Sequence, residues 1–547
     1  MKASPKRLWI TYSMLFAVLT MVFISSGCSN SNKAGKETES PAPVNSASTE
    51  PVDTNSFKFP VDPGSVTLRV GVQDSYYAPA SLAKNLPVFQ EIEKKTGVKI
   101  EWEVTPPAQF AQAIKLKLAS GSGYGDVIQA PSVEDMVKYG SEGIFIPLEG
   151  LIEKYAPNIK KLMDEDPNIA INHKSPDGHI YGISTLNYSP QQTTWLLRQD
   201  WLDKLNLKAP ETAEDWLKVL RAFKTQDPNG NNKQDEIPLS IAGNDVTGGI
   251  NTLAYFSNVF GLHLPGEWWA DESGKVSYEW IDDKVKDWLA FAKTLYEEKL
   301  LDQEFVVNTS DRETANINNN LVGTVLKHAG NIPIMQSAMK QAGVSSPKWT
   351  ATIPAKTQSG EQFIVGYPLT STYVAISKEN KHPEITMMWL DYLLGTTEGR
   401  RYMTLGIEGE SYVVEDDKIK FTDAALHPEP GVDYLRSLGA NSILPRLTGF
   451  ENEEAYWMAT DPKMWDQIMD MQKFVVPPFP TLISTEEENA EINSILTDMD
   501  TYRQEMLLKM ITGKESLDKF EDYKAQMKKL GVDKLISIKQ KQYDRVK

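Results

Sequence analysis

The sequence predicts an α/β protein with a doubly wound sheet and a body too large for one hydrophobic core. From residue 66 the pattern reads strand, helix, strand, helix, strand, which is typical of such sheets. About 490 residues follow the polar N-terminal stretch, so a two-domain body is expected. Cys28 is the only cysteine, and the fold must therefore be stabilised by core burial without disulfides.

The predicted elements of the first sheet follow one another closely. Residues 66–72 (VTLRVGV) are rich in β-branched side chains and predict a buried strand. A helix over 81–96, a strand over 98–104, a helix over 110–119 and a short strand over 126–130 come next. In doubly wound sheets ligands meet the loops at the carboxyl ends of the strands. Here these loops are 73–77 and 129–132.

The N-terminus predicts export. Lys2, Lys6 and Arg7 precede an apolar run over 8–24, which is the pattern of a signal peptide over 1–27. The sequence SSGC resembles the lipobox of bacterial lipoproteins, in which Cys28 would carry a diacylglyceryl anchor, although Ser25 stands where an aliphatic residue is usual. The alternative is an ordinary secretory signal with a chance cysteine. The polar stretch 28–60 then predicts a disordered tether on the extracellular face of the cell membrane.

The composition excludes some partners. The formal net charge is −17, and it becomes more negative when the three cations of the signal peptide are removed. Such an acidic chain is not expected to bind nucleic acid or an anionic lipid surface, so the anchor would be its only membrane contact.

Several sequence segments, taken together in their order along the chain, resemble one protein family. They are ASGSGYGDVIQA (119–130), DGHIYGI (177–183), WLLRQDWLDKLNLKAPETAEDW (195–216) and the closing stretch 511–545. Together they resemble the family 1 extracellular solute-binding proteins, in particular the large lipoprotein branch that includes alginate- and oligosaccharide-binding proteins. The resemblance implies two α/β lobes, each a sheet flanked by helices, with the ligand held in a cleft between them. It also implies a monomer that delivers its ligand to the permease subunits of an ABC importer.

The resemblance also implies lobe boundaries. The N-terminal lobe is expected over 61–190 and 318–365, because NNLVGTVLKHAGN (319–331) resembles the family's return strand. The C-terminal lobe is expected over 191–317 and 366–547, enlarged by the helical patterns at 385–395 and 486–510.

One loop predicts a structural Ca²⁺ site. In DPNGNNKQDE (227–236) oxygen-bearing side chains recur at alternate positions, as hard cations require. The loop begins like an EF-hand but has Asn232 in place of the glycine and Pro238 in place of the closing glutamate. The alternative is a solvated Asn/Gly turn. By resemblance to shortened loops in the alginate-binding relatives, the expected ligands are Asp227, Asn229, Asn231, Lys233 through its carbonyl, Asp235 and Glu236.

A carbohydrate-binding site is expected to combine aromatic rings with polar side chains, because sugars have apolar faces flanked by hydroxyls. Each candidate also has a structural explanation: core packing for the aromatic residues, a helix N-cap for the pair at 244–245, and a surface position for the arginine. The candidates for ligand contact are Asp74, Tyr76, Gln129, Tyr188, Trp195, Asn244, Asp245, Trp268, Tyr367, Arg446 and Trp457.

No pattern predicts catalysis. The sequence has no GxSxG elbow, Walker loop or HExxH motif, and its six histidines are scattered. We therefore expect a binding protein and no enzyme. Two alternatives remain open: an oligopeptide binder of the same fold, and a surface polysaccharide hydrolase or lyase, whose two carboxylates could not be chosen among 74 acidic residues.

Overall fold

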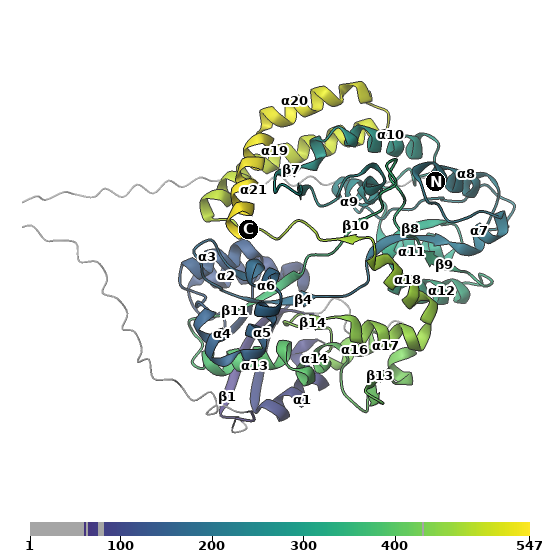
Figure 1. The fold of residues 1–547 in the computed structure, drawn as a ribbon. Helices are drawn as coiled ribbons and strands as arrows, with labels where there is room; N and C mark the ends of the chain where they lie inside the picture. Colours follow the sequence, from purple (N-terminus) through teal and green to yellow (C-terminus); the bar gives the residue numbers. More distant parts are fainter. Residues whose placement is uncertain (1–58, 62–63, 75–80, 429–431) are drawn as a thin grey trace, which may run out of the picture. The chain divides into compact units, whose positions relative to one another are not determined.

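The computed structural model describes residues 59–61, 64–74, 81–428 and 432–547 (Figure 1). The predicted signal peptide, the anchor Cys28, nearly all of the tether and the candidate Tyr76 lie outside these residues. Within the described part of the chain, no helix combines the length and hydropathy needed to cross a membrane.

The first lobe is built on a six-stranded sheet in the order β14-β4-β11-β3-β1-β2. β1 pairs in parallel with β2 and β3, as the strand and helix alternation predicts, whereas β11 runs antiparallel between β3 and β4. The strands are β1 (Val66–Gln73), β2 (Val98–Thr105), β3 (Val127–Gln129), β4 (Ile183–Asn187), β11 (Thr370–Ile376) and β14 (Leu447–Thr448).

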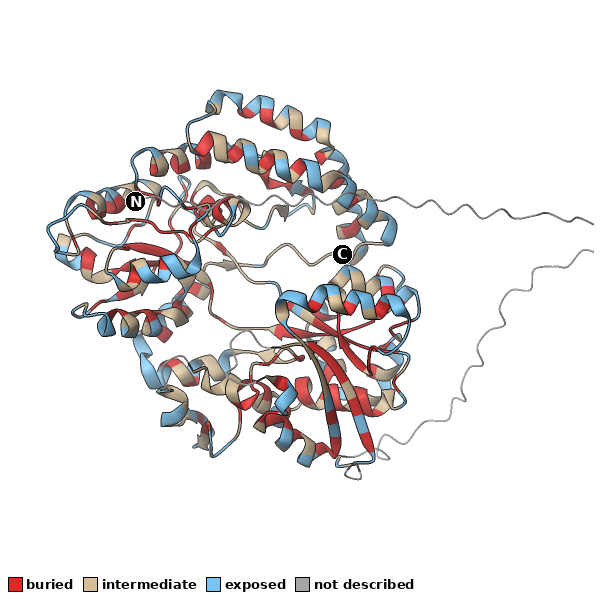
Figure 2. Ribbon diagram, turned by 180° about the vertical axis from the view of Figure 1, so that it is seen from behind, coloured by how far each residue is buried: buried red, intermediate tan, exposed pale blue. Residues whose placement is uncertain are grey.

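Helices cover both faces of this sheet because its strands are apolar on both sides. Val127 and Val374 face one core with α1, α4, α5 and α13, while Ile128 and Ala375 face a second core with α2 and α3. Figure 2 shows buried strands between helices whose outer faces are exposed. The helices of this lobe are α1 (Pro87–Thr96), α2 (Pro107–Ser120), α3 (Val133–Ser141), α4 (Glu149–Tyr155), α5 (Pro157–Glu165), α6 (Pro167–His173), α13 (Pro383–Gly395), α14 (Thr397–Thr404) and α16 (Tyr434–Leu438).

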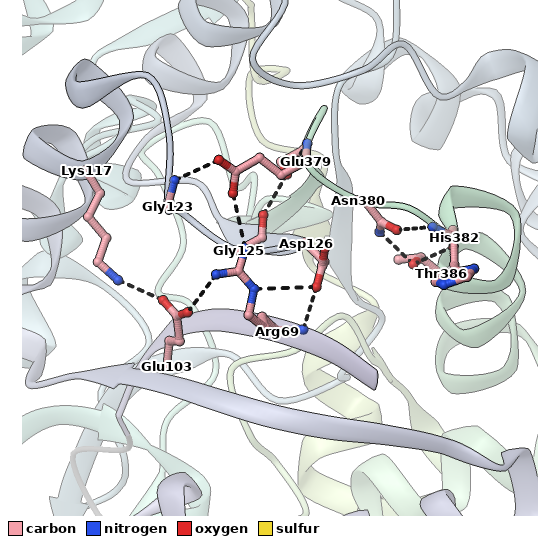
Figure 3. Close-up of polar contacts among 11 residues, drawn as sticks. Arg69, Glu103, Lys117, Gly123, Gly125, Asp126, Glu379, Asn380, His382 and Thr386 are labelled. Atoms are coloured by element: carbon pink, nitrogen blue, oxygen red, sulfur yellow. Dashed lines mark hydrogen bonds and ion pairs between the residues drawn. The ribbon is translucent and has the colours of Figure 1, made fainter. Parts of the chain in front are cut away.

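The turn between α2 and β3 is fastened by a polar network (Figure 3). Arg69 on β1 donates to Glu379 Oε2 at 3.1 Å, and the other Glu379 oxygen accepts from Gly123 N at 2.7 Å. The backbone N–H of Arg69 donates to Asp126 Oδ2 at 2.8 Å. Glu103 on β2 lies 3.7 Å from Arg69 Nη1. The glycine-rich turn is therefore held by the sheet's own side chains, and it fixes where β3 begins.

The second lobe is built on a three-stranded sheet in the order β8-β5-β9. Side chains of β5 alternate between two cores, as the two-residue period of a strand requires. Trp195 and Leu197 enter the core formed with α8, α10 and α19 to α21, and Leu196 enters the core formed with α12 and α18. The strands are β5 (Thr193–Arg198), β8 (Thr324–His328) and β9 (Trp349–Ala351).

The helices of the second lobe come from distant parts of the sequence. They are α7 (Gln199–Leu205), α8 (Ala213–Thr225), α9 (Val246–Leu253), α10 (Lys284–Glu297), α11 (Ser310–Asn318), α12 (Ile332–Gln341), α17 (Phe450–Thr460), α18 (Pro462–Gln472), α19 (Glu486–Ile511), α20 (Phe520–Leu530) and α21 (Val532–Val546).

Small sheets and short helices complete the fold. They are β6 (Trp268–Ala270) with β7 (Val276–Tyr278), β10 (Ile364–Val365) with β15 (Val475–Val476), β12 (Tyr412–Glu415) with β13 (Lys418–Phe421), α15 (Asp423–Leu426), and the 3-10 turns η1 (Leu82–Lys84), η2 (Ala254–Phe260), η3 (Glu279–Ile281), η4 (Ala329–Asn331) and η5 (Leu517–Lys519).

Two of the predicted lobe assignments are wrong. The stretch 318–365 was expected in the first lobe, but β8 and β9 pair with β5 in the second sheet. The stretch 366–547 was expected in the second lobe, but β11 lies inside the first sheet and α13 packs in its core. The chain does cross between the lobes near Gly366, in the opposite direction to the one expected. An apolar strand of five residues does not specify which sheet it joins, because that choice depends on non-local packing.

Candidate binding site

Two cavities meet at one tryptophan. We call the first the aromatic cavity: it has a volume of about 260 Å³, and residues 255, 263–266, 268–269, 364–368 and 478–479 supply much of its lining. We call the second the polar cavity: it has a volume of about 410 Å³ and is lined by residues of α2, α3, α19 and α21. Trp268 lines both. The two cavities are therefore neighbours at this residue.

Stacked rings form one wall of the aromatic cavity. Trp269 lies on His263 with ring centres 3.5 Å apart and an interplanar angle of 4°, and Phe363 stacks on His263 at 4.7 Å. The carboxylate of Glu279 is buried and lies 2.8 Å from His263 Nδ1, which fixes the orientation of the imidazole ring. Flat apolar rings held this rigidly suit the apolar face of a sugar ring.

Tyr367 lines the aromatic cavity from the crossing segment between β10 and β11. Its hydroxyl bonds with Thr193 Oγ1 and lies 3.3 Å from His328 Nε2. Burial raises the pKa of Tyr367 to about 12, so this hydroxyl stays neutral under physiological conditions. Tyr367 thus links the crossing segment to the second sheet and also presents a ring to the cavity.

The polar cavity contains charges of both signs. Lys115 Nζ lies 3.0 Å from Asp135 Oδ2, so this pair compensates itself. Ser132, the N-cap of α3, also contributes its hydroxyl, which lies 3.0 Å from Asp135. The side chains of Glu267 and Lys539 complete the charged lining with Glu134, and Asn489 and Asn493 add amides. Hydroxyl donors and acceptors of a sugar would find partners throughout this cavity.

The carboxyl edge of the first sheet brings two predicted residues together. Gln129 Oε1 accepts from Gln73 N at 2.9 Å, and Asp74 Oδ1 accepts from Leu82 N at 3.1 Å. Gln129 is buried, and neither residue lines the aromatic or the polar cavity. Both contacts shape the edge of the sheet, so a ligand role for this pair stays a prediction.

Two predicted aromatic contacts are core residues. Trp195 is 6% exposed and stacks on Phe256 with ring centres 4.1 Å apart, while Trp216 packs against its edge at 6.5 Å. Trp457 is completely buried in the core behind the second sheet. At these exposures neither Trp195 nor Trp457 presents a ring face to a ligand. Of the predicted aromatic residues, Trp268 and Tyr367 line the aromatic cavity.

The other predicted contacts also have structural partners. Asp245 caps α9 by accepting from Gly248 N at 2.7 Å, and Asn244 precedes it with a left-handed φ of 60°. The hydroxyl of Tyr188 donates to Asp166 Oδ2 at 2.7 Å. Arg446 donates to the carbonyl of Ser442, and burial lowers its pKa to about 10. None of these four predicted residues lines the aromatic or the polar cavity.

Several residues of the two cavities were not predicted as ligand contacts. Those outside the predicted set include Tyr255, His263, Glu267, Trp269 and Phe479. The dipeptide Trp268-Trp269 followed by the turn DESG was a detectable signal, because adjacent tryptophans in a short loop seldom both enter a core. Phe479 had a weaker signal, namely its position within PPFP, where the flanking prolines exclude a helix.

The predicted calcium loop is closed by its own acidic residues. Asp227 Oδ1 accepts from Gly230 N at 3.0 Å and from Asn231 N at 3.1 Å, and its other oxygen accepts from Asn232 N at 3.0 Å. Asp235 accepts from the amides of Asn229 and Asn231 at 3.2 and 3.0 Å. Among the described residues, no group of three or more His, Cys, Asp or Glu side chains is placed to hold a metal.

Glu236 is the unusual member of this loop. It is 1% exposed, and neither carboxylate oxygen has a hydrogen-bond partner. Burial raises the pKa of Glu236, and the nearby Asp227 and Asp235 raise it further. A buried carboxylate without a partner is costly unless a cation or a proton compensates it. A divalent cation in this loop would supply that compensation, whereas in the described structure Asp227 and Asp235 bond to the loop's own amides.

Two sheets with flanking helices, joined at crossing segments and carrying a rigid aromatic cavity, define a two-lobed solute-binding protein. The family model described as bacterial extracellular solute-binding protein matches residues 75–399. The chain belongs to this family.

Relatives with known ligands share the fold. The fructooligosaccharide ABC transporter substrate-binding protein FusA of Streptococcus pneumoniae is 26% identical over 539 residues, covering 91% of this chain and 94% of FusA. Its structure in complex with kestose has a TM-score of 0.69, covering 88% of this chain and 99% of that chain at 25% identity. The structure of alginate-binding protein AlgQ2 without calcium ion has a TM-score of 0.71, covering 88% and 98% of the two chains at 24% identity.

Proposed function

We propose that this protein captures a carbohydrate of two or more units outside the cell and delivers it to an ABC importer. The observation that carries the proposal is the aromatic cavity, whose stacked rings suit a sugar face and whose lining contains no lysine, arginine, aspartate or glutamate. The relationship to FusA over most of both chains supports it. The predicted anchor at Cys28 would keep the protein at the membrane beside the permease.

The ligand is proposed to stack on Trp268 and Trp269. These two residues end the turn that separates the aromatic cavity from the polar cavity. Either cavity alone is near or below the lower end of the volumes typical for small-molecule sites, about 300–1,000 Å³. A ligand longer than one sugar unit would use both.

Calorimetry with an oligosaccharide panel and a peptide library tests the proposal. The panel contains kestose, maltotriose, xylotriose and cellotriose, and we expect heat from at least one of them. Trp268→Ala should then weaken binding by about 1–3 kcal/mol, the scale of a buried aromatic side chain. Heat from peptides with none from sugars would favour the oligopeptide-binding alternative. Turnover of a bound sugar would favour the enzyme alternative.

We also propose that the loop over residues 227–236 binds one structural Ca²⁺ with Asp227, Asn229, Asn231, Asp235, Glu236 and the carbonyl of Lys233 as ligands. The buried, unpartnered carboxylate of Glu236 supports this, and so does a solved structure of a FusA variant described as an EF-hand mutant. The bound ion would stabilise the second lobe and take no part in chemistry.

A further inference from the structure

The turn over residues 266–269 lies between the two cavities. Gly266 and Trp269 line the aromatic cavity, Glu267 lines the polar cavity, and Trp268 lines both. This turn thus presents two rings and a carboxylate to adjacent parts of the site. Its chemistry bears on which sugars the site accepts.

The backbone of Glu267 is held in a conformation that few residues adopt. Its φ is 58°, in the left-handed region, and its carbonyl accepts from Glu279 N at 2.8 Å. A glutamate there has no conformational advantage over glycine or asparagine. The backbone conformation therefore does not explain a glutamate at this position, and the contacts of its carboxylate are what distinguish it from glycine or asparagine.

The carboxylate of Glu267 forms an ion pair with a buried arginine. Arg503 Nη1 lies 2.7 Å from Glu267 Oε1, and the Arg503 side chain is only 4% exposed. The guanidinium also lies 3.3 Å from Asp500 Oδ1 and 4.9 Å from the ring centre of Trp280, which restrict its motion. The Glu267 side chain keeps 29% of its surface exposed. One side of the carboxylate is thus anchored, and the other remains available to the polar cavity.

The remaining charges do not favour an anionic ligand. Lys115 is already paired with Asp135. Lys539 is the other lysine of the lining; burial lowers its pKa, while the nearby Glu134 and Glu267 oppose that shift and already compensate part of its charge. Glu134 adds a further negative group. Glu134, Asp135, Glu267 and Asp500 thus outnumber the cations Lys115, Lys539 and Arg503 in and beside this cavity, so a carboxylate on the ligand would enter surroundings of net negative charge.

We propose that Glu267 is a specificity-determining residue that selects neutral oligosaccharides. Positioned by Arg503, it accepts hydrogen bonds from hydroxyls of the sugar unit that follows the one stacked on Trp268. It rejects uronic acids at the same position by charge repulsion. This inference rests on the proposed carbohydrate function and specifies its substrate class.

The test compares affinities for neutral and acidic sugars in wild type and Glu267→Gln. The probes are kestose, maltotriose, xylotriose and cellotriose on one side, and trigalacturonate and an alginate trimer on the other, measured by calorimetry. We expect the wild type to bind a neutral probe at least 100-fold more tightly than the acidic probes. Glu267→Gln should lose about tenfold or more for the neutral probe and lose less, or gain, for the acidic ones. Glu272→Gln, on the exposed turn between β6 and β7, is the matched control and should change neither affinity.

Each result has a defined meaning. Wild-type preference for an acidic probe, or Glu267→Gln binding the neutral probe within threefold of wild type, overturns the inference while the carbohydrate function stands. Absence of binding to every sugar overturns the carbohydrate function itself, and the inference with it. If Glu267→Gln does not fold, Glu267→Asp retains the charge but withdraws it by one methylene, so neutral affinity should fall while acidic probes stay excluded.

Discussion

The two lobes differ in how their sheets are assembled. In the first lobe β1, β2 and β3 follow one another with one helix between each pair, and they lie side by side in the sheet. In the second lobe β5 pairs with β8 and β9, which come more than 120 residues later. Most of the aromatic cavity also comes from the second lobe and the segments beside it. Local sequence order thus places three neighbouring strands of the first sheet, which β11 and β14 join from far along the chain, whereas the second sheet consists of non-local pairs throughout.

The second lobe places its tryptophans in two different environments. In the second lobe, Trp195 and Trp216 form a packed core with Phe256, while Trp268 and Trp269 remain at a cavity. The same residue type therefore has two separate roles within one lobe. Substitutions can separate them, because a core role affects folding and a cavity role affects binding.

Trp195→Ala should give the largest effect on stability. Its removal leaves a cavity between Phe256 and Trp216, and such changes cost about 3–5 kcal/mol. Denaturant unfolding followed by tryptophan fluorescence measures this. Trp268→Ala is the paired variant and should cost much less stability while it weakens sugar binding. Equal stability losses in the two variants would contradict the separation of core and cavity roles.

Much of the first lobe was predictable from the sequence, and most of the site was not. Residues 66–72 and 98–104 carry a strong period and lie one helix apart, so strand type and pairing were both accessible. By contrast, whether Trp195 or Trp268 reaches a cavity depends on what covers each ring, and that depends on Phe256, 61 positions from Trp195. The pairing of Glu267 with Arg503, more than 230 residues apart, gave no local signal.

In the first lobe, stability should depend on pH through His173. Burial lowers the pKa of His173 from 6.5 to about 4, and the ring lies between Ile169 O at 2.6 Å and Ser184 N at 3.1 Å. Because the folded pKa lies below the unfolded one, the unfolded state binds more protons between these values. The contribution of neutral His173 to the free energy of unfolding is therefore fully present above about pH 6.5. It is lost as the pH drops toward 4, which costs about 3 kcal/mol for this group alone.

Thermal unfolding between pH 4 and 7 tests this dependence. His173→Gln should lose stability at pH 7 and show a shallower slope below pH 6.5. The exposed His427→Gln is the matched control and should retain the wild-type slope. If the stability of His173→Gln falls with pH as steeply as that of the wild type, the acid sensitivity comes from other groups.

In the second lobe, stability should depend on Ca²⁺. An ion present at 100 times its Kd adds about 2.7 kcal/mol to folding, so a strong chelator should lower the melting temperature. Glu236→Gln should be destabilising in excess Ca²⁺ but neutral or stabilising in chelator, because it removes a buried carboxylate that then has no partner. Glu214→Gln, on the exposed face of α8, should show no such reversal. Identical melting of the wild type with and without chelator would exclude the site.

The smallest expected change in stability is at the crossing segment, where Tyr367 bonds to the second sheet and also lines the aromatic cavity. Tyr367→Phe keeps the ring in the aromatic cavity but removes the hydroxyl that bonds with Thr193 and lies near His328. The loss of one such hydrogen bond costs about 0.5–1.5 kcal/mol. Since the pKa of Tyr367 is raised to about 12, wild-type sugar affinity should not change with its ionisation between pH 7 and 10.

Calorimetry and unfolding together locate the contribution of this hydroxyl. If it serves only the crossing segment, Tyr367→Phe lowers stability and leaves sugar affinity within about threefold of wild type. If it also contacts the sugar, affinity falls by about tenfold, because the ligand loses a partner in a desolvated site. Tyr402→Phe on α14, in the first lobe, provides the matched control for affinity. Tyr367 would then have two separable functions: its ring stacks on the sugar, and its hydroxyl holds the crossing segment to the second sheet.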